Sequence, residues 1–495
     1  MGGLLDIKLS LISLYRHIII LISMVVMAIS IVADSPMWAF YSVMLIWLNN
    51  IIFAFQKSHG RTALLVFQLA FFNFLLGGTF INFIDTGTPL YNFDNSILLH
   101  SYLALYISQL FLYISYNFFE RRTLTKKIAN PEGERKSNII SYIRFASLII
   151  MGITFIPYLL EIYDKIHYVS NNSYADIYLR SSSSLPYPIQ KAAQCFAPSF
   201  FVYLGTMPSK RKAMLPISMY IFAGALSVLV GARADFARSI MVVFFYFLAR
   251  DRWANKRGER WFGKKEKLAL IALVPILLLF LYNVGNERWD NSEESSSGLN
   301  SINSFFVEQG VSVSVIHYAK QYEDVIPNNM YVLGPVINLF IENPVIKDAF
   351  GTETYRNQTI EGALYGNRFG DTISYIVMPG RYQLGYGMGS SYIAEVYQSS
   401  GYLGLVLINI LYGVVFLLID RFFGRNTWVT AISLLMLYRL IYAPRAATLD
   451  FLSNTFNITY IAIFLGIFII AKMLSESTNK DHRLMIDTSQ NQKTL

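Results

Sequence analysis

Runs of apolar residues about as long as a lipid bilayer is thick recur along the whole chain. A helix needs roughly 20 such residues to cross the hydrocarbon core. By that measure the chain contains about twelve candidate spans. They cover residues 11–33, 37–56, 62–84, 97–118, 139–161, 190–207, 214–231, 236–250, 268–285, 400–420, 427–443 and 455–473. This pattern predicts an all-α, polytopic integral membrane protein.

The composition agrees with a membrane protein. Of the 495 residues, 54% are hydrophobic and 15% are charged, and the mean hydropathy is +0.40. A soluble domain has closer to one quarter charged residues. We expect the first span to be retained, because it is long for a signal peptide and no small-residue cleavage site follows it. The single cysteine, Cys195, excludes an intrachain disulfide framework.

Basic residues are distributed unevenly among the segments between the spans. Segments 119–137 and 250–267 are rich in Lys and Arg, whereas the longest polar segment, 286–391, has more acidic than basic residues. Because Lys and Arg concentrate on the cytoplasmic side, we expect both termini to be cytoplasmic and 286–391 to be external. The formal net charge of +9 then reflects orientation and anionic inner lipid, and nucleic acid is not expected as a partner. Arg144, near the inner end of its span, is expected to snorkel to the headgroups.

This topology divides the chain into three parts. Residues 1–285 form a membrane domain with the first nine transmembrane helices, and 286–391 form a large external loop with short helices. Residues 392–495 hold the last three transmembrane helices and a cytoplasmic tail. None of these parts is expected to stand apart as a soluble domain.

The external loop has its own pattern. Apolar positions in 302–322 predict an amphipathic helix, although the alternation at 311–315 leaves a strand open. A second helix is expected near 335–349, and 378–390 is rich in glycine, which permits unusual backbone angles. Long loops are often functional, and the Tyr, Asn and Gln residues here suit either sugar recognition or a membrane interface. A simple tether is the alternative.

One turn between two spans carries charge to membrane depth. Residues 231–239 read GARADFARS and include Arg233, Asp235 and Arg238. Ionisable groups at this depth are costly and usually face a protein interior or a polar cavity. The planar guanidinium matches phosphate oxygens, so the turn indicates a site for a phosphate or diphosphate. The structural alternative is that Asp235 pairs with Arg238 at i,i+3.

Three further charged residues are expected at the same level of the membrane. Glu395 precedes the tenth span, Arg439 lies in the outward half of the eleventh, and Arg445 lies at its outer end. The topology therefore predicts that these residues meet the arginines of the turn at the outer leaflet. Two structural alternatives remain open. Glu395 could neutralise an arginine, and the arginines could snorkel to the headgroups.

Motifs for metals and nucleotides were not found in the sequence. The six histidines lack metal-ligand spacing, and there is no His-Glu-x-x-His motif, paired-cysteine cluster or Walker-type phosphate loop. An enzyme with a lipid diphosphate donor can use arginines where a nucleotide-sugar enzyme often needs a metal. We therefore expect no metal and no cofactor.

Short motifs at the external loop carry a family resemblance. Residues 385–397 read GYGMGSSYIAEVY and are followed by GYLG at 401–404. Residues 305–312 read FFVEQGVS, and 372–375 read TISY. Together with the many spans, the large loop before the tenth and the Gly-x-Arg turn, these motifs resemble the Wzy family of oligosaccharide repeat-unit polymerases. The resemblance covers most of the chain.

The resemblance implies an enzyme. It would be a glycosyltransferase that joins undecaprenyl-diphosphate-linked oligosaccharide repeat units into O-antigen, capsular or exopolysaccharide. The reaction would take place at the outer face of the bacterial cytoplasmic (inner) membrane. The implied partners are membrane lipid and the flippase and chain-length regulator of the same pathway. The outer arginines of the family match Arg233 and Arg238 most directly, and Arg445 by position only.

Such a transfer needs cations that stabilise the charge on the departing diphosphate. We assign this role to Arg233, Arg238 and Arg445, with Arg439 in support.

The transfer also needs a carboxylate that accepts the proton of the attacking hydroxyl. Glu395 is the first choice and Glu308 the second, and structural pairing is an equally open reading for each. A carboxylate among arginines is expected to stay ionised. The loop is expected to clamp the substrates, with Arg381, Tyr392 and Gln398 as further contacts to sugar or diphosphate.

Three other functions are open. A flippase for lipid-linked oligosaccharides could also line a cavity with arginines, but the chain shows no internal repeat of the kind found in many transporters. A glycan ligase would use nearly identical chemistry. An acyltransferase would ordinarily need a catalytic histidine, and His167 and His317 have no convincing partner in the sequence.

Overall fold

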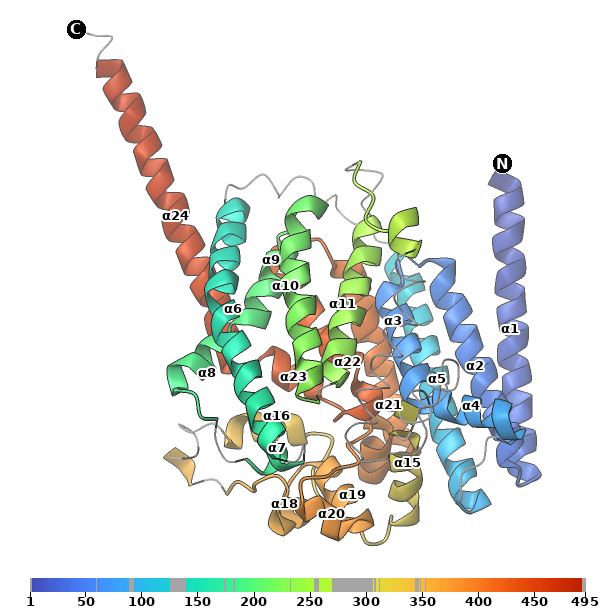
Figure 1. Cartoon of the computed structure of the whole chain (residues 1–495). Helices are drawn as coiled ribbons and strands as arrows, with labels where there is room; N and C mark the ends of the chain where they lie inside the picture. The colour runs from blue at the N-terminus through green and yellow to red at the C-terminus, as the bar shows by residue number, and fades with distance from the viewer. Residues whose placement is uncertain are drawn as a thin grey trace.

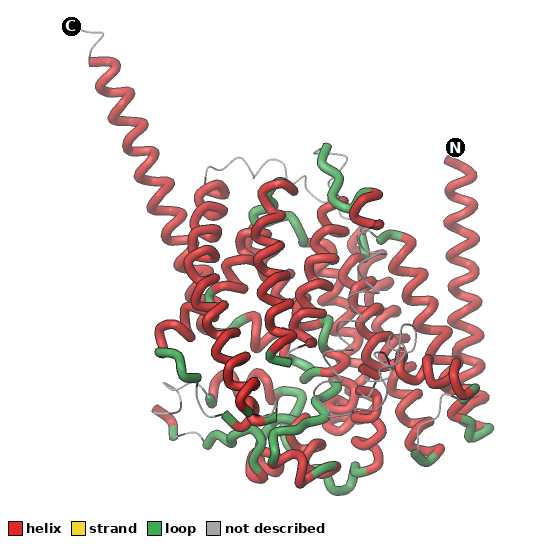
Figure 2. The backbone as a smooth tube through the Cα atoms, viewed as in Figure 1, coloured by secondary structure: helices red, strands yellow, loops and turns green. Residues whose placement is uncertain are grey.

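The computed structural model describes most of the chain (Figure 1). The described residues are 2–58, 60–88, 93–124, 139–172, 175–180, 183–231, 233–252, 258–268, 306, 309–310, 312–342, 347, 349–351 and 353–491. In the first and last helices, side chains are described from Ile12 onward and as far as Ser477. Every regular element within these residues is a helix, as predicted (Figure 2).

The helices fall into three groups along the chain. The first group is α1 (Gly2–Val32), α2 (Pro36–Gln56), α3 (Thr62–Phe71), the π-helix η1 (Phe72–Leu76), α4 (Gly77–Thr86), α5 (Asn95–Leu124), α6 (Ile139–Asn171), α7 (Asp176–Leu179), α8 (Tyr187–Gln194), α9 (Phe196–Gly205), α10 (Lys210–Leu229) and α11 (Arg233–Asp251). The second is α15 (Ser312–Gln321), α16 (Gly334–Ile341), α18 (Ile360–Tyr365), α19 (Phe369–Val377) and α20 (Pro379–Gln383). The third is α21 (Tyr392–Phe422), α22 (Thr427–Leu440), the 3-10 turn η2 (Ala443–Arg445), α23 (Asp450–Thr455) and α24 (Ile458–Asn491).

Nine helical segments among the described residues are long and apolar enough to cross a membrane. They correspond to nine of the twelve predicted spans. The predicted span at 268–285 lies outside the described residues except for its first residue. The structure therefore supports a polytopic membrane protein without establishing twelve spans.

Two predicted spans differ from a long apolar helix. Residues 190–207 form two short helices that meet at Cys195. The break is explained by Pro198, which lacks an N–H group and whose ring would clash with the carbonyl of Gln194 in a continuous helix. The other, α11, has 19 residues, with Arg233, Asp235 and Arg238 near its start, so it is less apolar than the other spans.

The helices form one bundle with two distinct ends (Figure 1). α21 packs against α5, and α22 packs against α9, so the first and last parts of the chain share this bundle. The start of α1, the end of α24 and the start of α10 lie at one end, and the helices α15 to α20 gather at the other (Figure 1). We call these the terminus end and the loop end. The turn between α10 and α11 lies at the loop end (Figure 1).

The described part of 286–391 contains short helices, α15, α16, α18, α19 and α20, joined by turns and irregular segments. α15 settles the ambiguity at 311–315 in favour of helix for residues 312–315, and α16 corresponds to the second expected helix. After α20, the glycine-rich segment lies against the bundle. A Cβ atom at Gly385, where φ is 91°, would lie 2.2 Å from the carbonyl oxygen of Ala175, so only glycine fits this contact.

Candidate functional site

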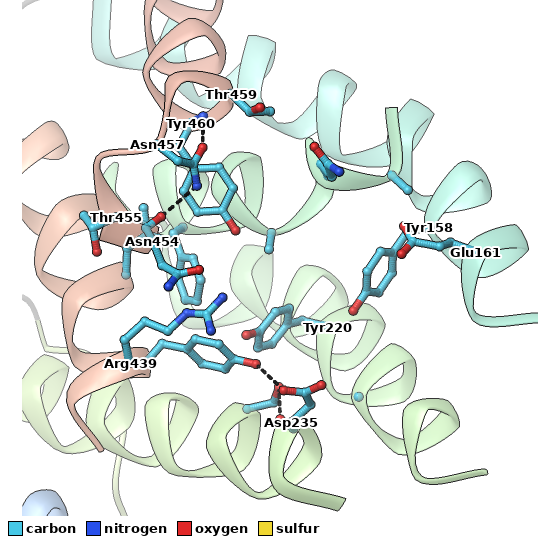
Figure 3. Close-up of a pocket in the computed structure, with 18 of the residues that line it drawn as sticks. Tyr158, Glu161, Tyr220, Asp235, Arg439, Asn454, Thr455, Asn457, Thr459 and Tyr460 are labelled. Carbon is cyan, nitrogen blue, oxygen red and sulfur yellow. Dashed lines mark hydrogen bonds between the residues drawn. The ribbon is translucent and has the colours of Figure 1, made fainter. Parts of the chain in front are cut away.

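A cavity of about 480 Å³ lies between the helices on the α6 side of the bundle (Figure 3). Its walls come from α6, α8, α9, α10, α11, α22, α23 and α24, and Leu339 of α16 also reaches it. The polar and aromatic lining residues are Tyr158, Glu161, Gln194, Phe201, Tyr220, Ser227, Asp235, Ser239, Tyr438, Arg439, Asn454, Thr455, Asn457, Thr459 and Tyr460. A polar cavity inside an apolar bundle is the environment in which intramembrane charges are expected to be functional.

Arg439 supplies the positive charge of the cavity wall. It occupies the last turn of α22, and its Nη1 lies 3.7 Å from Oδ2 of Asp450 at the start of α23. The Arg439 side chain is 27% exposed, so part of the guanidinium remains accessible. The ion pair orients the side chain, whose planar fork of donors suits a phosphate group.

Asp235 and Arg238 form an ion pair on the first turns of α11. This is the i,i+3 pair named in the structural alternative. Arg238 is buried, and its guanidinium carbon lies 4.9 Å from the ring centre of Tyr438 and 4.6 Å from that of Tyr442. The Asp235 side chain is 45% exposed and lines the cavity, where the Tyr438 hydroxyl lies 3.5 Å from its Oδ1. The Asp235 carboxylate therefore faces the cavity, and Arg238 lies behind the cavity wall.

Glu161 is a second carboxylate in the lining, and the sequence analysis missed it. It lies on α6 and accepts a hydrogen bond of 2.6 Å from Lys165, one turn later. Its side chain is 23% exposed. The signal in the sequence was an acidic residue at the end of a predicted span, where ionisable groups are uncommon.

The predicted arginines lie in different surroundings. Arg439 lines the cavity, and Arg238 lies directly behind its wall. Arg233 is the first residue of α11 and is half-buried outside the lining. Arg445, in η2, donates a hydrogen bond of 3.2 Å to Oε1 of Gln309. Arg381 is exposed on α20.

The other expected substrate contacts do not line the cavity. Tyr392 is fully buried, and its hydroxyl donates to Oδ1 of Asn409 at 3.1 Å. Gln398 donates a hydrogen bond of 3.3 Å to the carbonyl oxygen of Glu323. Glu308 lies outside the described residues.

Glu395 is held in the protein interior and is only 1% exposed. Its Oε1 accepts from the Ser390 hydroxyl at 2.7 Å, and its Oε2 accepts from the N–H (2.7 Å) and hydroxyl (2.8 Å) of Thr448. Its hydrogen-bond partners among the described residues are thus hydroxyl and amide groups, whereas the sequence led us to expect arginines. The glutamate ties the start of α21 to the segment between η2 and α23.

We expect Glu395→Ala to lower the stability of the protein by more than about 2 kcal/mol, because a buried donor without an acceptor costs roughly 1–3 kcal/mol. Thermal unfolding in detergent measures this change. Glu361→Ala is the matched control, since Glu361 is exposed on α18. An unchanged melting temperature would contradict this structural role and return Glu395 to the candidates for the reacting carboxylate.

Within the described ranges, no three His, Cys, Asp or Glu side chains are grouped as metal ligands would be.

The fold and the cavity define a polytopic membrane protein with a charged, aromatic-lined site between its helices. The family model of the O-antigen polysaccharide polymerase Wzy matches residues 14–477. The chain therefore belongs to the Wzy O-antigen polymerase family, which confirms the resemblance drawn from its motifs. No curated protein and no solved structure matches the chain. Membership supports a membrane enzyme of polysaccharide biosynthesis that polymerises O-antigen repeat units.

Proposed function

We propose that the protein transfers a growing glycan from a polyprenyl diphosphate onto a new lipid-linked repeat unit, and that the transfer takes place in the cavity at Arg439 and Asp235. The observation that carries this proposal is that an accessible arginine and an accessible carboxylate line the same cavity. Tyrosine rings and the side-chain amides of Asn454 and Asn457 surround them and suit sugar faces and hydroxyls.

In the proposed step, the acceptor hydroxyl oxygen forms a bond to the anomeric carbon of the donor sugar. The bond from that carbon to the diphosphate oxygen breaks, and the diphosphate keeps the electron pair. Arg439 stabilises the charge that develops on the diphosphate, as a preorganised donor group does. Asp235 accepts the hydroxyl proton.

Arg238 takes a supporting role in this proposal. Its ion pair with Asp235 and the rings of Tyr438 and Tyr442 offset part of the cost of burying the cation. We assign Arg233 and Arg445 to the diphosphate of the second lipid-linked substrate. The position of the α10–α11 turn at the loop end supports this assignment for Arg233 (Figure 1).

We assign the loop end to the outer face of the cytoplasmic membrane, with 286–391 external and both termini inside. The support is the basic character of the segments at the terminus end, such as Lys210, Arg211 and Lys212 at the start of α10. The flippase and the chain-length regulator remain proposed partners on the strength of the family alone.

Cysteine labelling tests this orientation. In a Cys195→Ser background, we expect an impermeant maleimide added to intact cells to label Glu353→Cys and to leave Lys264→Cys unlabelled. Both positions are exposed. Near position 353, Arg356 donates a hydrogen bond to the carbonyl oxygen of Leu179, which precedes α8. Near position 264, Glu266 accepts a hydrogen bond from Lys210 at the start of α10. The reverse labelling pattern would invert the proposed topology.

A reaction with purified protein in detergent separates the rival functions. With a synthetic polyprenyl-diphosphate oligosaccharide as donor and acceptor, a polymerase yields a ladder of products. A flippase yields no new bond, because its only product is a change of membrane side. A ligase needs a different acceptor and leaves the oligosaccharide unextended.

A further inference from the structure

A second hollow, of about 440 Å³, lies beside the start of α10. That end of α10 is at the terminus end of the bundle, away from the helices α15 to α20 (Figure 1). It is lined by Arg144 of α6, Met207 and Ser209 of the turn between α9 and α10, Lys212 of α10, and Glu259. The cavity at Arg439 shares none of these residues. The hollow therefore requires a separate explanation.

The backbone of this hollow is held in place. Met207 has φ = 53°, a left-handed conformation that is uncommon for a residue other than glycine. The next carbonyl, that of Pro208, accepts a hydrogen bond of 2.8 Å from Arg250, and the carbonyl of Lys212 accepts one of 2.7 Å from the Tyr203 hydroxyl. The turn thus presents its lining residues in a fixed arrangement.

The single carboxylate of the lining is already occupied. Oε1 of Glu259 accepts the backbone N–H of Lys210 at 2.8 Å, and Oε2 lies 3.9 Å from Nη2 of Arg250. Arg250 therefore balances the negative charge of Glu259, and the Glu259 carboxylate caps the first N–H group of α10.

The two cations of the lining lack such a balance. Arg144 donates through Nε (3.0 Å) and Nη2 (2.9 Å) to Thr206, a neutral residue. Among the described side chains, no carboxylate lies within 4 Å of the charged nitrogens of Arg144 or Lys212. A guanidinium and an ammonium that face one hollow, with the Ser209 hydroxyl beside them, match the oxygens of one phosphate group.

The surface beside the hollow is apolar. Leu148, four residues after Arg144, is 39% exposed, and Leu215, three residues after Lys212, is 68% exposed. Residues at these spacings lie on the same helix face as the cation. Apolar faces of α6 and α10 therefore extend away from the phosphate position. The acyl chains of a lipid bound there could lie along these faces.

We propose that this hollow binds the phosphate of an anionic phospholipid from the leaflet at the terminus end of the bundle. The site is independent of the proposed transfer reaction. A phosphatidylglycerol headgroup would place its phosphate against Arg144 and Lys212 and its acyl chains along Leu148 and Leu215.

Binding of phosphatidylglycerol to the purified full-length protein tests this proposal. The test uses native mass spectrometry and thermal unfolding in detergent, with phosphatidylcholine and inorganic phosphate as further probes. We compare the wild type with Lys212→Ala, Arg144→Gln and the double variant, and use Lys264→Ala as a control for an exposed lysine at the same end. The loss of each positive charge should weaken the binding of phosphatidylglycerol roughly fivefold, which is the contribution of one basic residue at an anionic surface.

The outcomes are distinct. The lipid site is supported if phosphatidylglycerol stabilises the wild type and Lys264→Ala but no longer stabilises Lys212→Ala. If Lys212→Ala loses this stabilisation but inorganic phosphate stabilises the wild type as well as phosphatidylglycerol does, the hollow binds a phosphate group. The ligand is then a free anion, and the assignment to a lipid is overturned. Equal binding of phosphatidylglycerol to wild type and Lys212→Ala overturns the proposal, even if Arg144→Gln fails to fold. Equal binding of phosphatidylcholine overturns it as well.

Discussion

Arg439→Ala is expected to slow chain elongation by about 10²–10³-fold while the protein remains inserted, since removal of one preorganised donor to a developing charge has an effect of this size. Arg439→Lys should recover part of the rate, because an ammonium keeps the charge and loses the planar fork. The measurement is the rate of product formation from a lipid-diphosphate oligosaccharide by purified protein at matched concentration.

Arg211→Ala is the matched control for this change. Arg211 is exposed on α10 and does not line the cavity. Wild-type elongation by a folded Arg439→Ala protein would show that the diphosphate binds elsewhere, with Arg233 and Arg445 as the next candidates.

Asp235→Asn is expected to reduce elongation by about 10²–10⁴-fold, the usual contribution of a positioned general base. The same change removes the counter-charge of buried Arg238, and because Asp235 is itself 45% exposed, the loss of stability should be smaller than the roughly 3–5 kcal/mol of a fully buried pair. Loss of activity by this variant alone is therefore ambiguous. Its melting temperature must be measured beside its rate.

The double variant Asp235→Asn/Arg238→Gln separates the two effects, because it removes both charges and should regain stability. We expect it to melt near the wild-type temperature and still fail to elongate. Glu161→Gln, at the other cavity carboxylate, should retain more activity than Asp235→Asn. Recovery of elongation together with stability in the double variant would reduce Asp235 to a counter-ion.

Local sequence features predicted what local physics determines. The length of the apolar runs located the nine helices that can span a membrane, because span length depends on bilayer thickness. The spacing of Asp235 and Arg238 predicted their ion pair, because residues three apart in a helix are neighbours. The break at Cys195 is also encoded locally, in Pro198, although the apolar composition of 190–207 alone favours one continuous helix.

Features that depend on distant contacts were not predictable in this way. Glu395 was expected among arginines, but its partner Thr448 is 53 residues away and belongs to a segment whose fold the sequence pattern does not specify. The cavity likewise combines residues from Tyr158 to Tyr460, and only the packing of the helices brings Glu161 and Arg439 into one lining. The predicted topology placed the arginines at a common level of the membrane, but it did not predict which of them line the cavity.

Chemical blocking of the cavity tests most directly whether it is the site of transfer. In a Cys195→Ser background, Thr459→Cys introduces a thiol into the lining, and Ser170→Cys introduces one at an exposed position outside it. We predict that maleimide modification of Thr459→Cys stops elongation, that lipid-diphosphate donor slows this modification, and that modified Ser170→Cys still elongates. Full modification of Thr459→Cys without any loss of elongation would contradict the assignment of the reaction to this cavity.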